Sequence, residues 1–277
     1  MIDSDDAIVV SDLSAEYPAH GASAACVALH GVSLRVTRGE ILGVLGASGS
    51  GKSTLARIVA GRAVRDDTAS VAARITGGDV RVRGLGMRSL SKRDRAQLAF
   101  RVGYLAQDAA DTLPSTRTVG EIISEPIFQR DRRYNRRAAG ARVATMLDAV
   151  HLPLGVMTSY PYQLSGGQRQ RVALARSIVL GPSILVADDP TAGIDVTVRS
   201  AVVELFGQLR HERDFAAVIV SHDLAVLRHA TARIAVLERG GLIGYGDIDA
   251  VLSQREHPYI AKLADALDAQ RARESGA

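Results

Sequence analysis

The sequence predicts an α/β protein built on a mostly parallel sheet, and two observations support this. After residue 181, short apolar segments alternate with amphipathic ones at residues 183–188, 196–210, 216–221, 223–230 and 233–239. Such alternation is typical of parallel strands that helices cover on both faces. Earlier in the chain, the apolar segment EILGVLG leads through a glycine-rich turn into the helical segment KSTLARIVAG, which Gly61 closes.

The remaining segments predict two smaller additions to this sheet. Residues 7–10 and 27–36 have the composition of strands, and residues 71–83 resemble an exposed strand pair with TGGD as its turn. From about 108 to 180 the pattern becomes helical. Residues 118–127 and 136–150 carry apolar side chains at the three- and four-residue spacing of an amphipathic helix.

Composition limits the class of protein. The 277 residues suit one large domain, or one domain with an inserted subdomain, and no apolar run approaches the ~18 residues that span a bilayer. The start, MIDSDDA, has no basic region before an apolar block, so we expect no secretory signal. Cys26 is the single cysteine, which excludes an internal disulfide and a Cys-rich metal site, and we expect it in the core.

The charge of the chain permits an anionic partner without requiring one. The formal net charge is +4, and the densest basic run is RDRRYNRR at residues 130–137. We interpret this run as a solvated helical face or loop, with a docking surface as the alternative.

A phosphate-binding loop is predicted at GASGSGKS, residues 46–53, which matches the pattern G-x-x-x-x-G-K-[ST] between a strand and a helix. Glycines let the backbone curl so that its N–H groups face an anion, and the helix start adds partial positive charge. Lys52 would reach the β- and γ-phosphates, and the Ser53 hydroxyl would bind Mg²⁺. The predicted nucleotide contacts are Gly46, Ala47, Ser48, Gly49, Ser50, Gly51, Lys52, Ser53 and Thr54.

The lysine in this loop is itself informative. The chain has 34 basic residues, of which Lys52, Lys92 and Lys262 alone are lysines. A chain that uses arginine almost everywhere keeps a lysine where a compact ammonium group must enter a tight loop. Farther along, the apolar segment ILVA ends in Asp188 and Asp189. In phosphate-loop proteins an aspartate at such a strand end holds Mg²⁺, so we assign this role to Asp188.

The segment LSGGQRQR at residues 164–171 completes a set of four motifs, together with the phosphate loop, Asp188 and SHD at 221–223. In their order and spacing the motifs resemble those of ABC-transporter nucleotide-binding subunits, over almost the whole chain. The resemblance implies one nucleotide-binding domain, 1–277, with a RecA-like P-loop NTPase core, an antiparallel β subdomain and an inserted helical subdomain. The implied divisions are about 8–107 and 181–246 for the core with its β subdomain, 108–180 for the helical subdomain and 247–277 for a C-terminal extension.

This resemblance also implies a role for individual residues. ATP lies between the phosphate loop of one subunit and the signature residues of a second, which here are Ser165, Gly166, Gly167 and Gln168. Gln107 would contact Mg²⁺ and relay the nucleotide state to a membrane partner. His222 would contact the γ-phosphate, and Asp195 would cross the dimer interface. Tyr17 is the candidate for stacking on adenine, with a core aromatic as the alternative.

The position of the general base departs from the family's pattern, in which a glutamate follows the Mg²⁺ aspartate. This chain has Asp189 there, one methylene shorter. One interpretation is compositional, because the chain has more Asp than Glu throughout. The other is that Asp189 marks the weaker hydrolysis site of an asymmetric pair, which favours a heterodimer over a homodimer.

Segments 73–84, 102–127 and 255–267 resemble the oligopeptide, dipeptide and nickel importer subunits. This implies an ATPase with ATP and Mg²⁺ as cofactors that energises import, most simply of peptides, through integral membrane permeases. The partners would be those permeases, a second ABC subunit and, indirectly, an extracytoplasmic solute-binding protein. We expect a peripheral position at the cytoplasmic membrane face, a groove near Gln107 for a permease helix, no iron–sulfur cluster and no nucleic acid. Two alternatives remain: a soluble ABC ATPase acting on nucleic acid or the ribosome, and a regulatory subunit that binds ATP without turnover.

Overall fold

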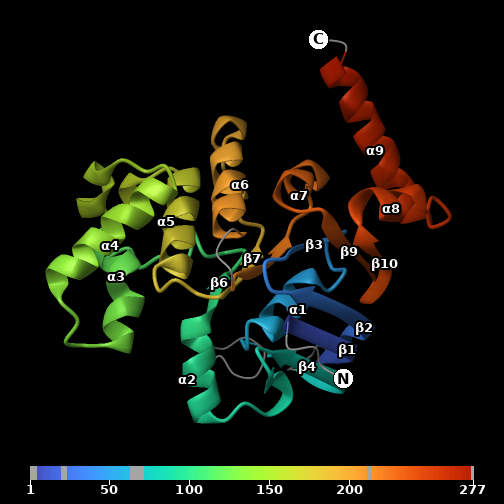
Figure 1. Cartoon of the computed structure of the whole chain (residues 1–277), viewed down its shortest axis with the longest axis horizontal. Helices are drawn as coiled ribbons and strands as arrows, with labels where there is room; N and C mark the ends of the chain where they lie inside the picture. Colours follow the sequence, from blue (N-terminus) through green and yellow to red (C-terminus); the bar gives the residue numbers. More distant parts are fainter. Residues whose placement is uncertain (1–4, 20–23, 63–71, 211–213, 276–277) are drawn as a thin grey trace.

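Two β-sheets form the centre of the described part of the molecule, and helices cover the larger sheet on both faces (Figure 1). The computed structural model describes residues 5–19, 24–62, 72–210 and 214–275. In this part of the chain the larger sheet has six strands in the order β10-β9-β3-β8-β7-β6. They are β3 (Ile41–Gly46), β6 (Val102–Leu105), β7 (Ile184–Asp188), β8 (Ala216–Val220), β9 (Arg233–Glu238) and β10 (Gly241–Asp247). Strand β10 is antiparallel to β9, and the other pairs are parallel, as predicted.

The side chains of β3 alternate between two hydrophobic clusters, one on each face of this sheet. Leu42 and Val44 belong to the cluster that contains α1, whereas Ile41 and Leu45 belong to the cluster that contains α6 and α7. These helices are α1 (Lys52–Val59), α6 (Val196–Arg210) and α7 (Leu224–Ala230). Burial on both faces explains why the strand sequences are continuously apolar rather than alternating.

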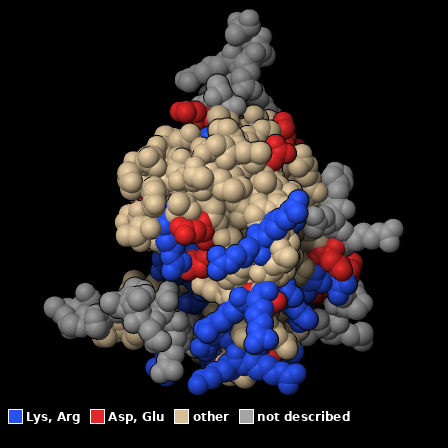
Figure 2. Space-filling model, turned by 90° about the vertical axis from the view of Figure 1, so that its left-hand side faces the viewer, with Lys and Arg blue, Asp and Glu red and all other residues tan. Residues whose placement is uncertain are grey.

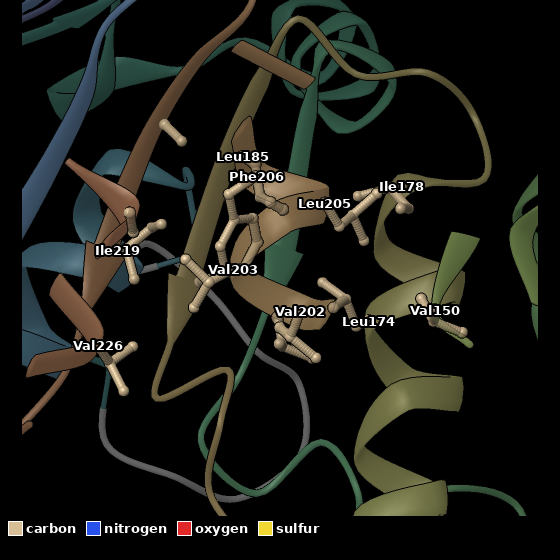
Figure 3. Packing of buried hydrophobic residues seen from close by; sticks show 14 of the residues in the cluster. Val150, Leu174, Ile178, Leu185, Val202, Val203, Leu205, Phe206, Ile219 and Val226 are labelled. Carbon is tan, nitrogen blue, oxygen red and sulfur yellow. The ribbon is translucent and has the colours of Figure 1, made fainter. Parts of the chain in front are cut away.

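Helix α6 fills the space between the sheet and the helical part of the chain. Figure 3 shows Phe206 directed toward Leu185 of β7, and Leu205 directed toward Ile178. Phe206 is fully buried. Large-to-small substitutions at such sites typically lower the free energy of unfolding by about 3–5 kcal/mol. The packing of Phe206 therefore stabilises the contact between α6 and the larger sheet.

A second, antiparallel sheet in the order β2-β1-β4-β5 lies on the far side of α1. Its strands are β1 (Asp6–Tyr17), β2 (Cys26–Thr37), β4 (Arg74–Val82) and β5 (Leu85–Gly86). The expected strand pair at 71–83 is wrong in one respect, because TGGD lies inside the single strand β4 (residue 71 is outside the described residues). The register against β1 shifts beside Gly78, which has a φ of +72° and whose Cβ would collide with the carbonyl oxygens of Ser11 and Asp12. The register shift is therefore a β-bulge in which Asp12 and Leu13 of β1 lie opposite Gly78.

Cys26 also differs from expectation, since it is exposed at the start of β2 rather than buried. Cys26 lines a cavity described below, at the end of the β1–β2 pairing.

The predicted helices at 118–127 and 136–150 are present and lie side by side on the left in Figure 1. The helices between β4 and β7 are α2 (Lys92–Arg101), α3 (Val119–Arg130), α4 (Arg136–Ala149) and α5 (Gly166–Ile178), with short 3₁₀ turns at Met87–Ser89, Leu154–Thr158 and Pro161–Gln163. Capping boxes at Thr118 and Ser165 fix the starts of α3 and α5. The division of the chain at 108 and 180 stays a prediction.

The C-terminal part contains α8 (Ile248–Ser253) and α9 (Pro258–Ser275). Ile260 and Ala264 of α9 join the cluster that contains α6 and α7, so the first half of α9 is anchored to the main body. Among the described residues, the helices are all too short or too polar to cross a lipid bilayer.

Candidate active site

A cavity of about 470 Å³ opens where the parallel strands end. Residues 48–54 of the β3–α1 turn line it, as do Asp188 and Asp189 at the end of β7 and His222 after β8. Gln107, two residues after β6, completes this edge, and Tyr17 with part of β2 forms the opposite wall. Ligand sites of open α/β sheets lie at the carboxyl ends of the strands, as here.

The turn between β3 and α1 folds as the glycine pattern predicts. Gly49 and Gly51 have φ values of +76° and +98°, and a Cβ on Gly51 would lie 2.5 Å from the carbonyl oxygen of Ala28. A Cβ on Gly46 would collide with the carbonyl oxygen of Leu237. Gly51 is the N-cap of α1 and has no side chain to cap it, so the first N–H groups of the helix point into the cavity wall as an anion site.

Lys52 lies across this cradle. Its Nζ donates to the carbonyl oxygens of Gly46 and Ala47, each at 2.7 Å, and to Ser50 Oγ at 3.4 Å. Burial lowers the pKa of Lys52, and the charges of Asp188 and Asp189 partly oppose that effect. A half-buried ammonium held by neutral carbonyls is a favourable partner for an anionic ligand.

Asp188 is buried, with 2% of its surface exposed, and its Oδ2 has no hydrogen-bond partner among the described residues. Burial raises the pKa of Asp188, while the Ser53 hydroxyl and the charges of Arg57 and Lys52 oppose the rise. An unsatisfied carboxylate oxygen beside a hydroxyl is a donor set that fits a hard cation such as Mg²⁺.

Asp189 has an unusual backbone torsion, and three hydrogen bonds fix its position. Its φ is +55°, its N–H donates to the Val220 carbonyl at 2.9 Å, and its own carbonyl accepts from Gln170 Nε2 at 3.2 Å. His222 Nδ1 donates to Asp189 Oδ2 at 2.8 Å, although the His222 side chain is 75% exposed. Asp189 Oδ1 has no partner in the described part of the chain. A left-handed, non-glycine residue is strained, and such strain gathers at active sites.

Tyr17 ends β1 and reaches α1, where its hydroxyl is hydrogen-bonded to Thr54 Oγ1 at 3.0 Å. Its ring lines the cavity beside Val27, which is 65% exposed. The geometry leaves a partly open aromatic face next to the phosphate cradle.

The signature residues Ser165–Gln168 and Asp195 lie apart from this cavity and are not among the described residues that line it. Ser165 Oγ accepts from Gln168 N at 3.2 Å, and Gln168 Oε1 accepts from Ser165 N at 2.9 Å, which closes the cap of α5. Gly167 packs against the loop that precedes Asp195, since a Cβ on it would lie 3.0 Å from the Gly193 carbonyl oxygen. The structure thus brings one set of the predicted residues together in this cavity, whereas the signature residues lie on another surface. The set is Tyr17, the phosphate loop, Gln107, Asp188, Asp189 and His222.

The sequence analysis did not single out Gln170 or the β2 residues that line the cavity. Gln170, which binds the Asp189 carbonyl, is only 2% exposed, and its signal is a glutamine at a core-facing position of α5. Val27 and Ala28 of β2 line the cavity without any sequence signal, because their role depends on where the second sheet lies.

Comparisons with known proteins identify the family. The pattern described as "ABC transporter" matches residues 29–192. The oligopeptide transport ATP-binding protein OppF of Escherichia coli is 34% identical over 242 residues, which are 87% of this chain and 69% of that protein. OppF of Lactococcus lactis subsp. lactis is 31% identical over 241 residues, or 87% of this chain and 72% of that protein.

Solved structures of ATP-binding cassettes share the fold of this chain. A dimeric, post-hydrolysis structure of the ATP-binding cassette MJ0796 bound to ADP and Pi has a TM-score of 0.77 at 27% identity, covering 87% of this chain and 98% of that one. The cassette CbiO1 of Clostridium perfringens, part of the transporter complex CbiONQ, shares the fold with a TM-score of 0.72 at 23% identity, covering 94% and 99%. The fold, the matched pattern and these sequence identities agree with one another. The chain therefore belongs to the ABC transporter family, as one of its ATPase subunits.

Proposed function

We propose that this chain binds Mg²⁺-ATP in the cavity at the strand ends and hydrolyses it to drive peptide import through membrane permeases. The observation that carries the ATP chemistry is the convergence of Lys52, Asp188, Asp189 and Gln107 on one cavity. The substrate class rests on the relatives, whose names describe oligopeptide transport and with which this chain shares about a third of its residues.

The site residues that the sequence singles out have separate tasks in this proposal. Lys52 and the first N–H groups of α1 hold the β- and γ-phosphates, and Tyr17 packs against the base. Asp189 accepts a proton from the attacking water through the carboxylate oxygen that lacks a partner, while His222 holds the other oxygen. Because positions matter to about 1 Å in such sites, the His222 contact serves to aim the carboxylate.

Three residues would hold the magnesium ion, namely Ser53, Asp188 and Gln107. The hydroxyl, the carboxylate and the amide would supply oxygen ligands, which Mg²⁺ prefers. When bound, Mg²⁺ neutralises charge on the transferred phosphoryl group.

A second cassette would supply what this cavity lacks. The helix start at Ser165 is a further anion site, and it lies outside the chain's own cavity. In a head-to-tail pair it would close on the partner's nucleotide, in keeping with the dimeric cassette MJ0796. We favour a heterodimer, because the shorter Asp189 suits the slower site of an unequal pair. A homodimer is the alternative that size and composition of the purified complex would reveal.

A hollow of about 310 Å³ beside Gln107 is the proposed docking groove for a permease helix. Phe100, Leu113, Pro126 and Leu180 give it an apolar floor, and it lies between the end of β6 and the helices α3 and α5. An amphipathic helix laid into such a groove is a common mode of recognition. Docking there would hold the chain at the cytoplasmic face of the membrane, with a solute-binding protein acting from the other side.

The test is reconstitution of the chain with its permeases and partner cassette in vesicles, followed by ATP turnover with and without peptide-loaded binding protein. Lys52→Ala should abolish nucleotide binding at micromolar ATP, since it removes the cation of the cradle. Lys92→Ala is the matched control, because Lys92 is exposed on α2. Unchanged nucleotide affinity in Lys52→Ala would refute the proposal. Copurification with RNA instead of permeases, or binding without turnover, would favour the two alternatives.

A further inference from the structure

The connection between α3 and α4 forms a basic hollow that the ATP chemistry does not use. Its volume is about 760 Å³. We call it the arginine hollow and define it by Arg117, Phe128, Arg132, Arg133, Tyr134 and Arg136. Figure 2 views the side of the molecule on which α3 and α4 lie, and Lys and Arg gather on the lower part of this side while the upper part is mostly uncharged.

The carboxylates near the hollow are already engaged. Glu125 accepts from Arg117 at 2.6 Å and from Arg176 at 2.8 Å, and Glu121 accepts from the N-cap residue of α3. Asp131 Oδ1 accepts from the backbone N–H of Arg133 at 2.9 Å. Glu121 and Glu125 line the hollow and lower its net positive charge, but these acids form no ion pair with Arg132, Arg133 or Arg136.

Three guanidinium groups remain available. Throughout the described ranges, the side chains of Arg132, Arg133 and Arg136 have neither an ion-pair partner nor a hydrogen-bond partner. Residues 129–138 are exposed without interruption. Planar guanidinium groups bind phosphate oxygens through two parallel hydrogen bonds, so three of them in one hollow form a phosphate-binding surface.

An aromatic side chain lies among these arginines. Tyr134 is 41% exposed and lines the hollow, and Phe128 is half-buried at its base. Tyrosine is enriched at membrane interfaces, because its ring favours the boundary between acyl chains and headgroups while its hydroxyl stays in water. This combination favours a lipid surface over a purely polar partner.

The hollow is continuous with the proposed docking groove. Gln129 lines both, and Arg176 of the groove is ion-paired with Glu125 of the hollow. A permease segment in the groove would therefore bring the hollow to the headgroup layer of the same membrane. This step alone rests on the proposed function, whereas the charge and exposure of the hollow do not.

We propose that the arginine hollow binds the phosphate groups of anionic phospholipids. The three unpaired arginines would meet headgroup phosphates while Tyr134 enters the interface. Each basic residue near an anionic leaflet strengthens partitioning to the membrane about fivefold, so three of them strengthen it roughly a hundredfold. Binding should weaken as salt is added, because the contact is largely electrostatic and exposed.

The experiment is cosedimentation of the full chain with vesicles that contain no permease, so failure of the transport proposal leaves the result interpretable. One set of vesicles is phosphatidylcholine alone, and the other contains phosphatidylglycerol as well. The wild-type chain should bind the anionic set and not the neutral one at about 0.1 M salt. The variant Arg132→Gln, Arg133→Gln, Arg136→Gln should bind roughly a hundredfold more weakly.

The matched control is Arg74→Gln, Arg81→Gln, Arg88→Gln, which removes the same charge from exposed positions of β4 and the turn after it. It should keep anionic vesicle binding within a few-fold of wild type. ATP affinity, unchanged in both variants, reports that they are folded, and the single reversal Arg133→Glu gives an independent arm that should also weaken binding. The proposal would be overturned by equal losses in the control and the hollow variant, or by no binding of the wild-type chain to anionic vesicles. It would also be overturned if the hollow variant lost RNA binding while it kept vesicle binding.

Discussion

Gln170 of α5 donates from Nε2 to the backbone carbonyl of Asp189 at 3.2 Å, and the Gln170 side chain is buried. Gln170 lies two residues after the signature Gln168, on the same helix. In the proposed pair of cassettes, the helix that would carry the signature to one nucleotide also holds the left-handed turn of Asp189 beside another. A hydrogen bond from a buried side chain is costly to break, so a movement of α5 would be transmitted to Asp189.

Gln170→Leu should slow ATP hydrolysis by about tenfold in the assembled transporter, because a lost buried hydrogen bond leaves the Asp189 turn free to relax. ATP affinity should change little, since Lys52 and the phosphate loop are untouched. Steady-state kcat and equilibrium nucleotide binding measure the two effects. Gln208→Leu, at an exposed position of α6, is the control. A fall in affinity without a fall in kcat would show that Gln170 acts on the cradle instead.

Asp189→Glu should raise hydrolysis at this chain's site by about tenfold or more if carboxylate reach limits the rate, since misplacement by about 1 Å can cost on the order of 10²-fold. Single-site turnover in the assembled transporter is the measurement. An equal or lower rate would mean that the site is built around aspartate, for which the 2.8 Å contact with His222 gives a physical basis. Asp189→Asn should abolish any hydrolysis through this carboxylate and leave nucleotide binding intact.

Tyr17→Ala should weaken ATP binding by about tenfold, because base–aromatic stacking contributes roughly 1–3 kcal/mol. Tyr17→Phe keeps the ring and removes only the hydrogen bond to Thr54, so its affinity should stay within about threefold of wild type. Titration with a fluorescent ATP analogue and with free triphosphate separates base from phosphate contacts. Equal losses in both variants would assign the role of Tyr17 to its hydrogen bond with Thr54 rather than to contact with the base.

Glu125→Gln should lower the Tm at neutral pH by about 1–4 °C, since partly exposed ion pairs contribute roughly 0.2–1 kcal/mol. Burial alone would raise the pKa of Glu125, but the hydrogen bonds and charges of Arg117 and Arg176 outweigh it and lower the pKa below the ordinary value of 4.5. A lowered pKa stabilises the fold above the ordinary value and loses that effect as the pH falls through the lowered one.

The Tm difference between wild type and Glu125→Gln should therefore narrow on acidification below about pH 4.5 and vanish at lower pH. Glu204→Gln, at an exposed position of α6, should show little difference at any pH. A Tm gap for Glu125→Gln that widens in acid would contradict this electrostatic explanation.

Local motifs allowed much of this site to be predicted. The phosphate loop and the strand end at Asp188 are contiguous in sequence, and their spacing specifies both backbone shape and chemistry. The bond between His222 and Asp189 could not be predicted, because 33 residues separate them and the contact depends on β7 lying beside β8. The same holds for Gln170, whose partner is set by how α5 packs.

The error at TGGD has a similar cause. A glycine pair favours either a turn or a bulge, and the choice is made by the partner strand β1, whose carbonyls approach Gly78. Helix α2 and strand β10 were not foreseen either. Six of the ten residues of α2 are charged or amide side chains with Leu98 as its one fully buried residue, so the helix has almost no apolar stripe to detect.

The close approach of Gly167 to Gly193 has a consequence for the evolution of paired cassettes. Because the signature and the loop before Asp195 touch within one chain, any side chain at Gly167 would displace both at once. In the proposed heterodimer that edge would face the other subunit's nucleotide, so the substitution would slow turnover at a phosphate loop that a different gene encodes. The two genes would then be selected together, because each would encode part of the other's active site.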